Sequence, residues 1–316
     1  MARRTRDPTT AFEAAERRLF AACRVQVAAR RVRLADPPLA VRVLETGEGP
    51  PLLLVHGSGT SASTWAPLMP QLAGHRLIAP DLPGFGLSDA LDYGGRSLRE
   101  HAVAQLSSLL DALELERVPI VGTSLGAMWA LCLAVDAPER VTAVAVLAVP
   151  AVALPGMRGD PFFTALSTPG VRHVVARIGS PSAAATRRSM AWGAMGRRAA
   201  ELAPDGFFAT IHEGMRQPGF RTAMLSHMWL AMRSGRPRPE NFLSDAELRD
   251  IAAPVLMILG DEDPYGSPEI GRRATALMRD AELEVIPGRH VPFLDDTERC
   301  AVLIGELPGR AGASAP

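Results

Sequence analysis

The chain has 316 residues, of which 47% are hydrophobic and 22% charged, a composition that is ordinary for a folded domain and excludes extensive disorder. Its 34 basic and 34 acidic side chains cancel, so the electrostatic signature of a nucleic-acid or anionic-membrane binder is missing. Every basic side chain is an arginine, which excludes mechanisms that require lysine, such as a Schiff base. Three widely separated cysteines predict neither a disulfide framework nor a metal cluster.

The basic start, Met1 to Arg6, leads into charged residues such as Glu13 and Glu16 and not into an apolar run, so we expect no signal peptide. No segment approaches the roughly 18 consecutive apolar residues of a membrane span. We therefore expect a cytoplasmic protein, monomer or homodimer. Its expected partner is a small-molecule substrate, with no nucleic acid and no membrane involved.

The first predicted element is an amphipathic helix over residues 8–30. We interpret residues 1–30 as an N-terminal helical extension packed on the outside of the main domain, and a partner-docking arm is the alternative. Two strand-like segments follow at 31–35 and 39–45, before a turn at 47–50.

From residue 51 onward, short apolar runs alternate with helical stretches. The predicted strands are 52–55, 76–79, 118–121, 141–149, 255–259 and 283–286, and the predicted helices are 62–73, 97–114, 125–136, 267–278 and 295–306. Buried strands that alternate with helices predict a parallel sheet covered on both faces. The fold class is therefore α/β, a doubly wound and mostly parallel sheet. Residues 31–150 and 244–306 form its core, and we expect 307–316 to be a flexible tail.

The alternation is interrupted over residues 151–243, which we predict to be mostly helical. This interval holds seven of the 12 methionines, at positions 157, 190, 195, 215, 224, 228 and 232. We interpret it as a helical cap, or lid, inserted after the sixth core strand, with an adaptable apolar cavity beneath it. Met224, Met228 and Trp229 are the cap residues that we expect to bind substrate.

A Gly-x-Ser-x-Gly pattern, Gly122 to Gly126, joins the strand at 118–121 to the helix at 125–136. The pattern alone arises easily by chance, but a sharp strand-to-helix turn lifts a serine hydroxyl above the sheet at a helix N-terminus. We predict that Ser124 is a nucleophile. The backbone N–H groups of Leu125 and Ser58 are the predicted oxyanion hole, because Ser58 follows a strand that ends at the same edge.

Two later strands end in polar turns at this same edge. Gly260 to Pro264 follows the strand at 255–259 and offers Asp261 and Asp263, and His290 follows the strand at 283–286. Histidine suits a general base near neutral pH, and a carboxylate can orient it and stabilise its charged form. The order along the chain is nucleophile, acid, base.

These pieces resemble the α/β-hydrolase fold family in its cap-bearing serine-hydrolase form. The resemblance covers residues 51–150 and 244–306 and rests on the motifs His56–Gly59, Asp81–Asp89, Gly122–Gly126, Gly260–Pro264 and His290. In the family the acid stands at the end of a Gly-x-x-Asp motif, which implies that Asp263, not Asp261, pairs with His290. Trp65 stands where relatives often carry a tryptophan, and we expect it to bind substrate.

The resemblance implies several chemistries and excludes others. Haloalkane dehalogenases and epoxide hydrolases use an aspartate where Ser124 stands, so both are excluded. Ester hydrolysis of a small, largely apolar substrate through an acyl-enzyme is the activity that we predict, without metal or cofactor. The alternatives are a carbon–carbon hydrolase of ring-cleavage products, a perhydrolase, or a non-hydrolytic synthase or receptor. The carbon–carbon hydrolases usually carry Met after the serine, where this chain has Leu125, and their diketo-acid carboxylate would need a cation such as Arg177, Arg187, Arg188 or Arg221.

Overall fold

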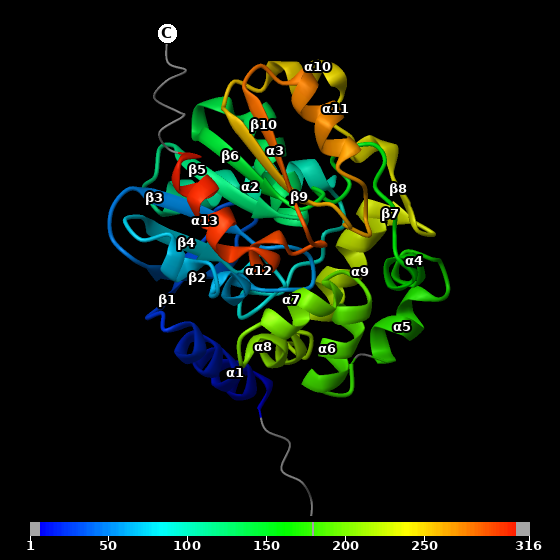
Figure 1. Cartoon of the computed structure of the whole chain (residues 1–316). Helices are drawn as coiled ribbons and strands as arrows, with labels where there is room; N and C mark the ends of the chain where they lie inside the picture. The colour runs from blue at the N-terminus through cyan, green and yellow to red at the C-terminus, as the bar shows by residue number, and fades with distance from the viewer. Residues whose placement is uncertain (1–6, 179, 308–316) are drawn as a thin grey trace, which may run out of the picture.

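Eight strands form one sheet in the computed structural model, which describes residues 7–178 and 180–307 (Figure 1). The strand order is β1–β2–β4–β3–β5–β6–β9–β10. Their bounds are β1 Ala28–Arg33, β2 Ala40–Thr46, β3 Pro51–Val55, β4 Arg76–Pro80, β5 Val118–Thr123, β6 Val141–Leu147, β9 Val255–Gly260 and β10 Ala281–Ile286. β2 pairs antiparallel with β1 and β4, and every other pair is parallel. The predicted mostly parallel α/β sheet is confirmed.

Both faces of the sheet are covered, because alternate side chains of each buried strand point to opposite sides. Along β3, Leu53 and Val55 belong to one core cluster, and Leu52 and Leu54 belong to the other. The first cluster is completed by α2 Leu98–Ala112, α3 Leu125–Asp136 and α11 Glu269–Leu277, with α10 Asp245–Asp250 beside them. The second is completed by the short helices α12 Pro292–Asp295 and α13 Thr297–Gly305 and by turns near Trp65.

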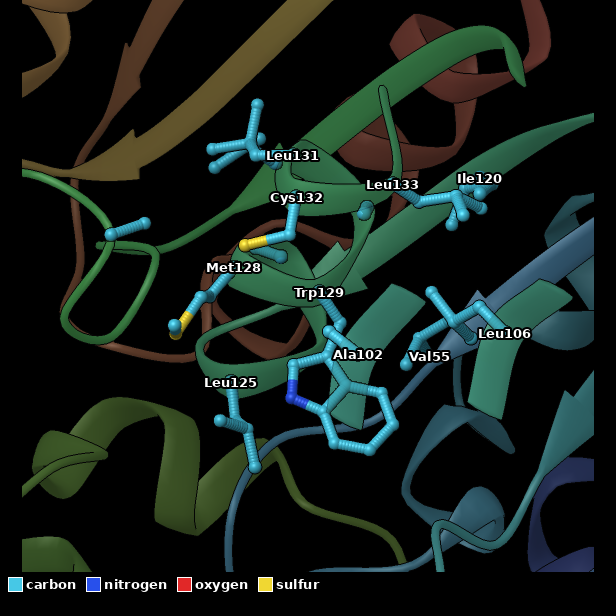
Figure 2. Close-up of a cluster of buried hydrophobic side chains, with 14 of the residues drawn as sticks. Val55, Ala102, Leu106, Ile120, Leu125, Met128, Trp129, Leu131, Cys132 and Leu133 are labelled. Atoms are coloured by element: carbon cyan, nitrogen blue, oxygen red, sulfur yellow. The ribbon is translucent and has the colours of Figure 1, made fainter. Parts of the chain in front are cut away.

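Helix α3 is the central element of the first cluster. Ten consecutive residues, Leu125–Ala134, are buried, so the helix is apolar on all sides. Figure 2 shows its side chains among Val55 and Ile120 of the sheet and Ala102 and Leu106 of α2. This packing fixes the N-terminus of α3, and with it the turn that precedes the helix.

Two predicted helices differ in the structure. α1 spans Pro8–Cys23 and ends there, because Arg24 adopts a left-handed conformation (φ 54°) and its N–H closes back on Ala21 and Phe20. Ala28–Arg30 lie in β1 and pair with β2, so the helix predicted over 8–30 is wrong in its last seven residues. The predicted helix at 62–73 is two 3₁₀ turns, Ala62–Trp65 and Met69–Gln71, since Pro67 between them has no N–H to donate.

Among the described residues, six α-helices lie between β6 and the short strand β7. They are α4 Pro161–Leu166, α5 Arg172–Ile178, α6 Ala183–Trp192, α7 Gly196–Leu202, α8 Phe207–Gly214 and α9 Phe220–Ala231, followed by the two-stranded β7 Met232–Arg233 and β8 Arg236–Pro237. Figure 1 shows α6–α9 gathered below the sheet, with α4 and α5 beside them. We call residues 151–243 the cap segment. Of the tail predicted at 307–316, only the buried Leu307 lies within the described residues.

Within the described part of the chain, no helix combines the length and the apolar character needed to cross a membrane. The three cysteines are unpaired thiols, and Cys132 and Cys300 are buried.

Candidate active site

Ser124 occupies a strained turn between β5 and α3. Its φ of 53° and ψ of −112° lie outside the regions that L-residues favour. A Cβ on Gly122 would lie 2.4 Å from the backbone carbon of Gly126, and a Cβ on Gly126 would lie 2.0 Å from the carbonyl oxygen of Val55. Both glycines of the Gly-x-Ser-x-Gly pattern are therefore required by close backbone approach, and the turn holds Ser124 at the N-terminus of α3.

His290 pairs with Asp263. The His290 Nδ1 lies 2.7 Å from Asp263 Oδ2, and the Asp263 side chain is fully buried. The backbone N–H of Val149 donates to Oδ2 at 3.1 Å, and that of Tyr265 donates to Oδ1 at 2.9 Å. Burial raises the pKa of Asp263, but the neighbouring His290 and these hydrogen bonds outweigh burial and leave the pKa below its ordinary value. The carboxylate therefore stays ionised and can stabilise a charged imidazole.

Asp261, the other acid of the turn, has a different partner. Its side chain is exposed, and its Oδ1 accepts a hydrogen bond from the backbone N–H of Gly288 at 2.9 Å. A Cβ on Gly260 would lie 2.2 Å from the carbonyl oxygen of Arg289, so the turns after β9 and β10 touch at this glycine. The structure thus places Asp263, and not Asp261, against His290, as the family motif implies.

The loop His56–Gly59 lies beside Ser124. A Cβ on Gly57 would be 3.3 Å from the Ser124 Cβ. His56 accepts a hydrogen bond at Nε2 from the backbone N–H of Leu82 (2.9 Å) and has its Nδ1 2.8 Å from Gly57 O. Burial lowers the pKa of His56, which keeps the ring neutral and structural. The loop therefore holds Ser58 next to the nucleophile candidate, and the roles of the Ser58 and Leu125 N–H groups stay a prediction.

His227 of α9 was not found by sequence reasoning. It is fully buried, with Nδ1 2.9 Å from Ala223 O and Nε2 2.7 Å from Ser58 Oγ. Burial lowers its pKa from 6.5 to about 4, so the ring is neutral and Nε2 accepts a hydrogen bond from the Ser58 hydroxyl. A lone histidine on the apolar face of a helix carries no motif, so only the packing of α9 on this loop identifies it.

Tyr265 is a second residue that the sequence did not indicate. Its ring stands edge-on to the His290 ring, with centroids 4.4 Å apart. Its hydroxyl donates a hydrogen bond to Oδ2 of Asp160, at the start of α4, at 3.1 Å. The backbone N–H of His290 donates to the carbonyl oxygen of Ala194, also in the cap segment, at 3.1 Å. The cap segment therefore touches the His290 loop at two points, one of them through Tyr265.

Two of the four predicted substrate-binding residues lie on the buried face of α9, and two lie elsewhere. Met224 lies against the Ser58 loop, 3.8 Å from Ser58 Oγ, and Met228 is buried one helical turn further along α9. Trp65 is fully buried in the second core cluster with its ring 5.1 Å from that of Phe293, and its role in substrate binding stays a prediction.

Trp229 points to the opposite side of α9 from Met224 and Met228, and its role in substrate binding stays a prediction. Its ring packs against the guanidinium groups of Arg172 and Arg238, at 4.7 and 5.3 Å. The arginines considered for a substrate carboxylate do not gather at the Ser58 loop either. Arg177 and Arg221 line a pocket next to Trp229, and the remaining two are exposed on α6.

The arrangement has the parts of nucleophilic catalysis. Ser124 follows β5, Asp263 follows β9 and His290 follows β10, so all three lie at the carboxyl edge of the sheet. A hydroxyl at a helix N-terminus, with a histidine held by an ionised carboxylate nearby, can support attack on a carbonyl carbon. No group of His, Cys, Asp and Glu that could hold a metal ion occurs among residues 7–178 and 180–307.

Comparison with known proteins agrees with this geometry. Residues 52–303 match the alpha/beta hydrolase family. The chain is 33% identical over 248 residues to a 2-hydroxy-6-oxo-2,4-heptadienoate hydrolase of Pseudomonas putida, covering 76% of this chain and 82% of the relative. It is 31% identical over 282 residues to a 2-hydroxymuconate semialdehyde hydrolase of a Pseudomonas species, covering 86% and 91%.

Solved structures show the same likeness. The meta-cleavage product hydrolase CumD of Pseudomonas fluorescens superposes with a TM-score of 0.70 at 25% identity, over 89% of this chain and 98% of that one. The carboxylesterase CesB of Bacillus subtilis superposes with a TM-score of 0.71 at 18% identity, over 95% and 98%. The second likeness is one of fold alone.

Proposed function

The chain is a hydrolase of the alpha/beta hydrolase family, and we propose that it cleaves a carbon–carbon bond in a 2-hydroxy-6-oxo-dienoate. The observation that carries this proposal is the 33% identity with a dienoate hydrolase over most of both chains. The His290–Asp263 pair and the Ser124 turn supply chemistry that suits it. The ester hydrolysis predicted from the sequence takes second place to the stated carbon–carbon alternative, because the likeness to a carboxylesterase is one of fold alone.

The difficulty of this reaction is that carbon is a poor leaving group. In the substrate, C6 is a ketone carbon and C5 belongs to the conjugated diene. Transfer of the 2-hydroxyl proton to C5 gives the 2-keto form, with the double bond at C3–C4. The electron pair of the C5–C6 bond can then leave into an enolate that ends on the C2 oxygen. The leaving group is then a resonance-stabilised enolate and not a simple carbanion, so cleavage of the C5–C6 bond is accessible.

We assign the steps as follows. Ser124 Oγ adds to C6 while His290 takes its proton, and the N–H groups of Ser58 and Leu125 hold the oxyanion. The C5–C6 bond breaks, and His290 returns the proton to the enolate oxygen. His290 next takes a proton from water, which attacks the acyl carbon and releases Ser124 with its proton restored. The products are a carboxylic acid and a 2-hydroxy-dienoate, and no step requires a metal or cofactor.

The surroundings of the site support these roles. Asp263 stays ionised and holds the imidazole through Nδ1, so the other ring nitrogen is free for the proton transfers. Met224, Met228 and the neutral His227 give the inner face of α9 no charge, which keeps water away from the enolate.

The test compares the activity of the enzyme on a carbon–carbon bond with its activity on an ester bond. Wild-type enzyme is assayed on 2-hydroxy-6-oxohepta-2,4-dienoate, by loss of the dienoate absorbance, and on p-nitrophenyl acetate and butyrate. We expect kcat/KM to be at least about 100-fold higher for the dienoate, about 2.7 kcal/mol of transition-state preference. Preference for an ester, with the dienoate untouched, would return the assignment to an esterase. A folded enzyme that is inactive on both substrate types would also contradict the proposal.

A further inference from the structure

A cavity lies between the cap segment and the loop at Asp92. It has a volume of about 360 Å³ and is lined by residues of α5, α9 and the loop at Asp92. Arg172, Arg177 and Arg221 contribute cationic groups to it, and Leu225 and Trp229 contribute apolar surface. We call it the outer pocket.

The outer pocket is separate from the candidate active site, although α9 borders both. Arg221, Leu225 and Trp229 are spaced by four residues and share one face of the helix. Met224 and Met228, with the same spacing, lie on the buried face toward Ser58. A ligand in the outer pocket would therefore contact the side of α9 that points away from Ser124.

Trp229 holds the guanidinium group of Arg172 in place. The Arg172 Cζ lies over the indole ring at 4.7 Å from its centroid, and Arg238 lies at 5.3 Å from the same ring. A stacked guanidinium keeps its planar fork oriented, so less side-chain freedom is lost when it binds an anion. The Nη1 atom of Arg172 is buried and has no hydrogen-bond acceptor among the described residues, which leaves an oriented donor to be satisfied.

The charge of the outer pocket is unbalanced. Within the described part of the chain, Arg172, Arg177 and Arg221 have no carboxylate within ion-pair distance, in contrast to pairs such as Arg99 with Asp136 elsewhere in the protein. Asp92 is the acidic residue of the lining. Three guanidinium groups and one carboxylate leave a net charge of 3 − 1 = +2, which two negative charges on a ligand would neutralise.

We propose that the outer pocket binds a small organic dianion, namely a phosphate monoester that carries an apolar group. Guanidinium forks match phosphate oxygens in geometry, and charge-assisted hydrogen bonds of this kind are among the strongest available. Leu225 and the exposed edge of Trp229 would accommodate the apolar group. The proposal is independent of the proposed function, because none of these residues belongs to the site at Ser124.

The test uses isothermal titration calorimetry with phenyl phosphate at about pH 8, where the phosphate carries both charges. Benzoate and benzamide serve as singly charged and neutral probes of the same ring. We expect wild-type protein to bind phenyl phosphate more tightly than benzoate and to leave benzamide unbound. Arg221→Gln and Arg172→Gln should each weaken phenyl phosphate binding by about tenfold, and added salt should weaken it further.

Arg188→Gln is the matched control, since Arg188 is an exposed arginine of the cap segment on α6, outside the pocket. It should bind phenyl phosphate as the wild type does. Arg221 is exposed, so its substitution tests binding without threatening the fold, and thermal unfolding of each variant checks this. Absence of binding to the wild type would overturn the proposal. Equal binding by wild type, Arg172→Gln and Arg221→Gln would also overturn it, because the phosphate would then lie elsewhere.

Discussion

The carboxyl edge of the sheet and the cap segment that covers it are built in opposite ways. At the edge, backbone contacts leave no choice of residue: a side chain at Gly126 would meet a carbonyl oxygen at 2.0 Å, and Asp263 is held by three hydrogen bonds. The cap segment is six helices of 6 to 12 residues, and side-chain packing decides which face of each is buried. Functional residues at the edge are therefore readable from motifs, whereas those of the cap segment are not.

The cap segment itself has two unlike flanks. On one flank, α8 packs against α1, and a Cβ on Gly206 would lie 2.6 Å from the backbone nitrogen of Leu19. On the other flank, large apolar side chains are exposed, including Phe162 (52%), Val174 (57%) and Trp192 (78%). The difference indicates a cap segment that is anchored through α8 and α1 and that exposes apolar side chains on α4, on α5 and at the end of α6.

The anchor rests on a buried ion network between α1 and the core. Arg42 of β2 donates to both carboxylate oxygens of Glu16, at 2.7 and 2.6 Å, and to Asp81 at 2.8 Å. Asp81 also accepts the backbone N–H groups of Ala62 and Leu87. The network therefore ties α1 to the same motif, Asp81–Asp89, that borders the candidate site.

The largest effect is expected at the edge. Ser124→Ala removes the proposed nucleophile, and we expect dienoate turnover to fall by about 10⁴-fold with the thermal unfolding midpoint unchanged. Trp192→Ala, at the end of α6 in the cap segment, should change kcat by less than about twofold, because its side chain is largely exposed. Comparable losses of kcat in the two variants would break the contrast between edge and cap segment.

The next prediction distinguishes Asp263 from Asp261, the two acids of the turn after β9, by their effect on kcat. Asp263→Asn removes the charge that stabilises His290 and should lower kcat by about 10³-fold, whereas Asp261→Asn should lower it less than about threefold. Steady-state kinetics on the dienoate measures both. Reversal of the two effects would mean that His290 takes its acid from the exposed position during catalysis.

Breaking the anchor should cost stability. Glu16→Gln leaves Arg42 with an uncompensated part of its charge in a buried site, and we expect a loss of about 3 kcal/mol in the free energy of unfolding. Glu13→Gln, on the exposed side of the same helix, should cost less than about 0.5 kcal/mol. Urea denaturation measures both, and equal losses would show that the ion network does not anchor α1.

The last expected effect, confined to acidic pH, concerns the contact between the cap segment and the edge. The His227 pKa of about 4 lies below its ordinary 6.5, so the unfolded chain binds this proton first as the pH falls. Stability from this group is therefore complete above pH 6.5 and is lost between pH 6.5 and 4, by at most about 3 kcal/mol. His227→Leu should flatten the stability profile over this range, as measured by urea denaturation at several pH values. A profile parallel to that of the wild type would contradict a neutral, buried His227.

Sequence reasoning succeeded where local backbone requirements leave a pattern. The strands β3 to β6, β9 and β10 and the turn at Ser124 follow from glycines and apolar runs at strand ends. The choice of Asp263 over Asp261 came from the resemblance to the family. It failed for the last residues of the helix predicted over 8–30, which join a sheet edge.

By itself, the sequence determined the fold class and the edge of the sheet at which the candidate residues Ser124, Asp263 and His290 meet, because strand ends and tight turns constrain residues that are neighbours along the chain. Only the tertiary structure decided that α9 turns Met224 and His227 inward and Trp229 outward, since every residue of a short helix can face the core until its neighbours are in place. The same holds for Glu16, whose partner Arg42 lies 26 residues away along the chain and also binds Asp81.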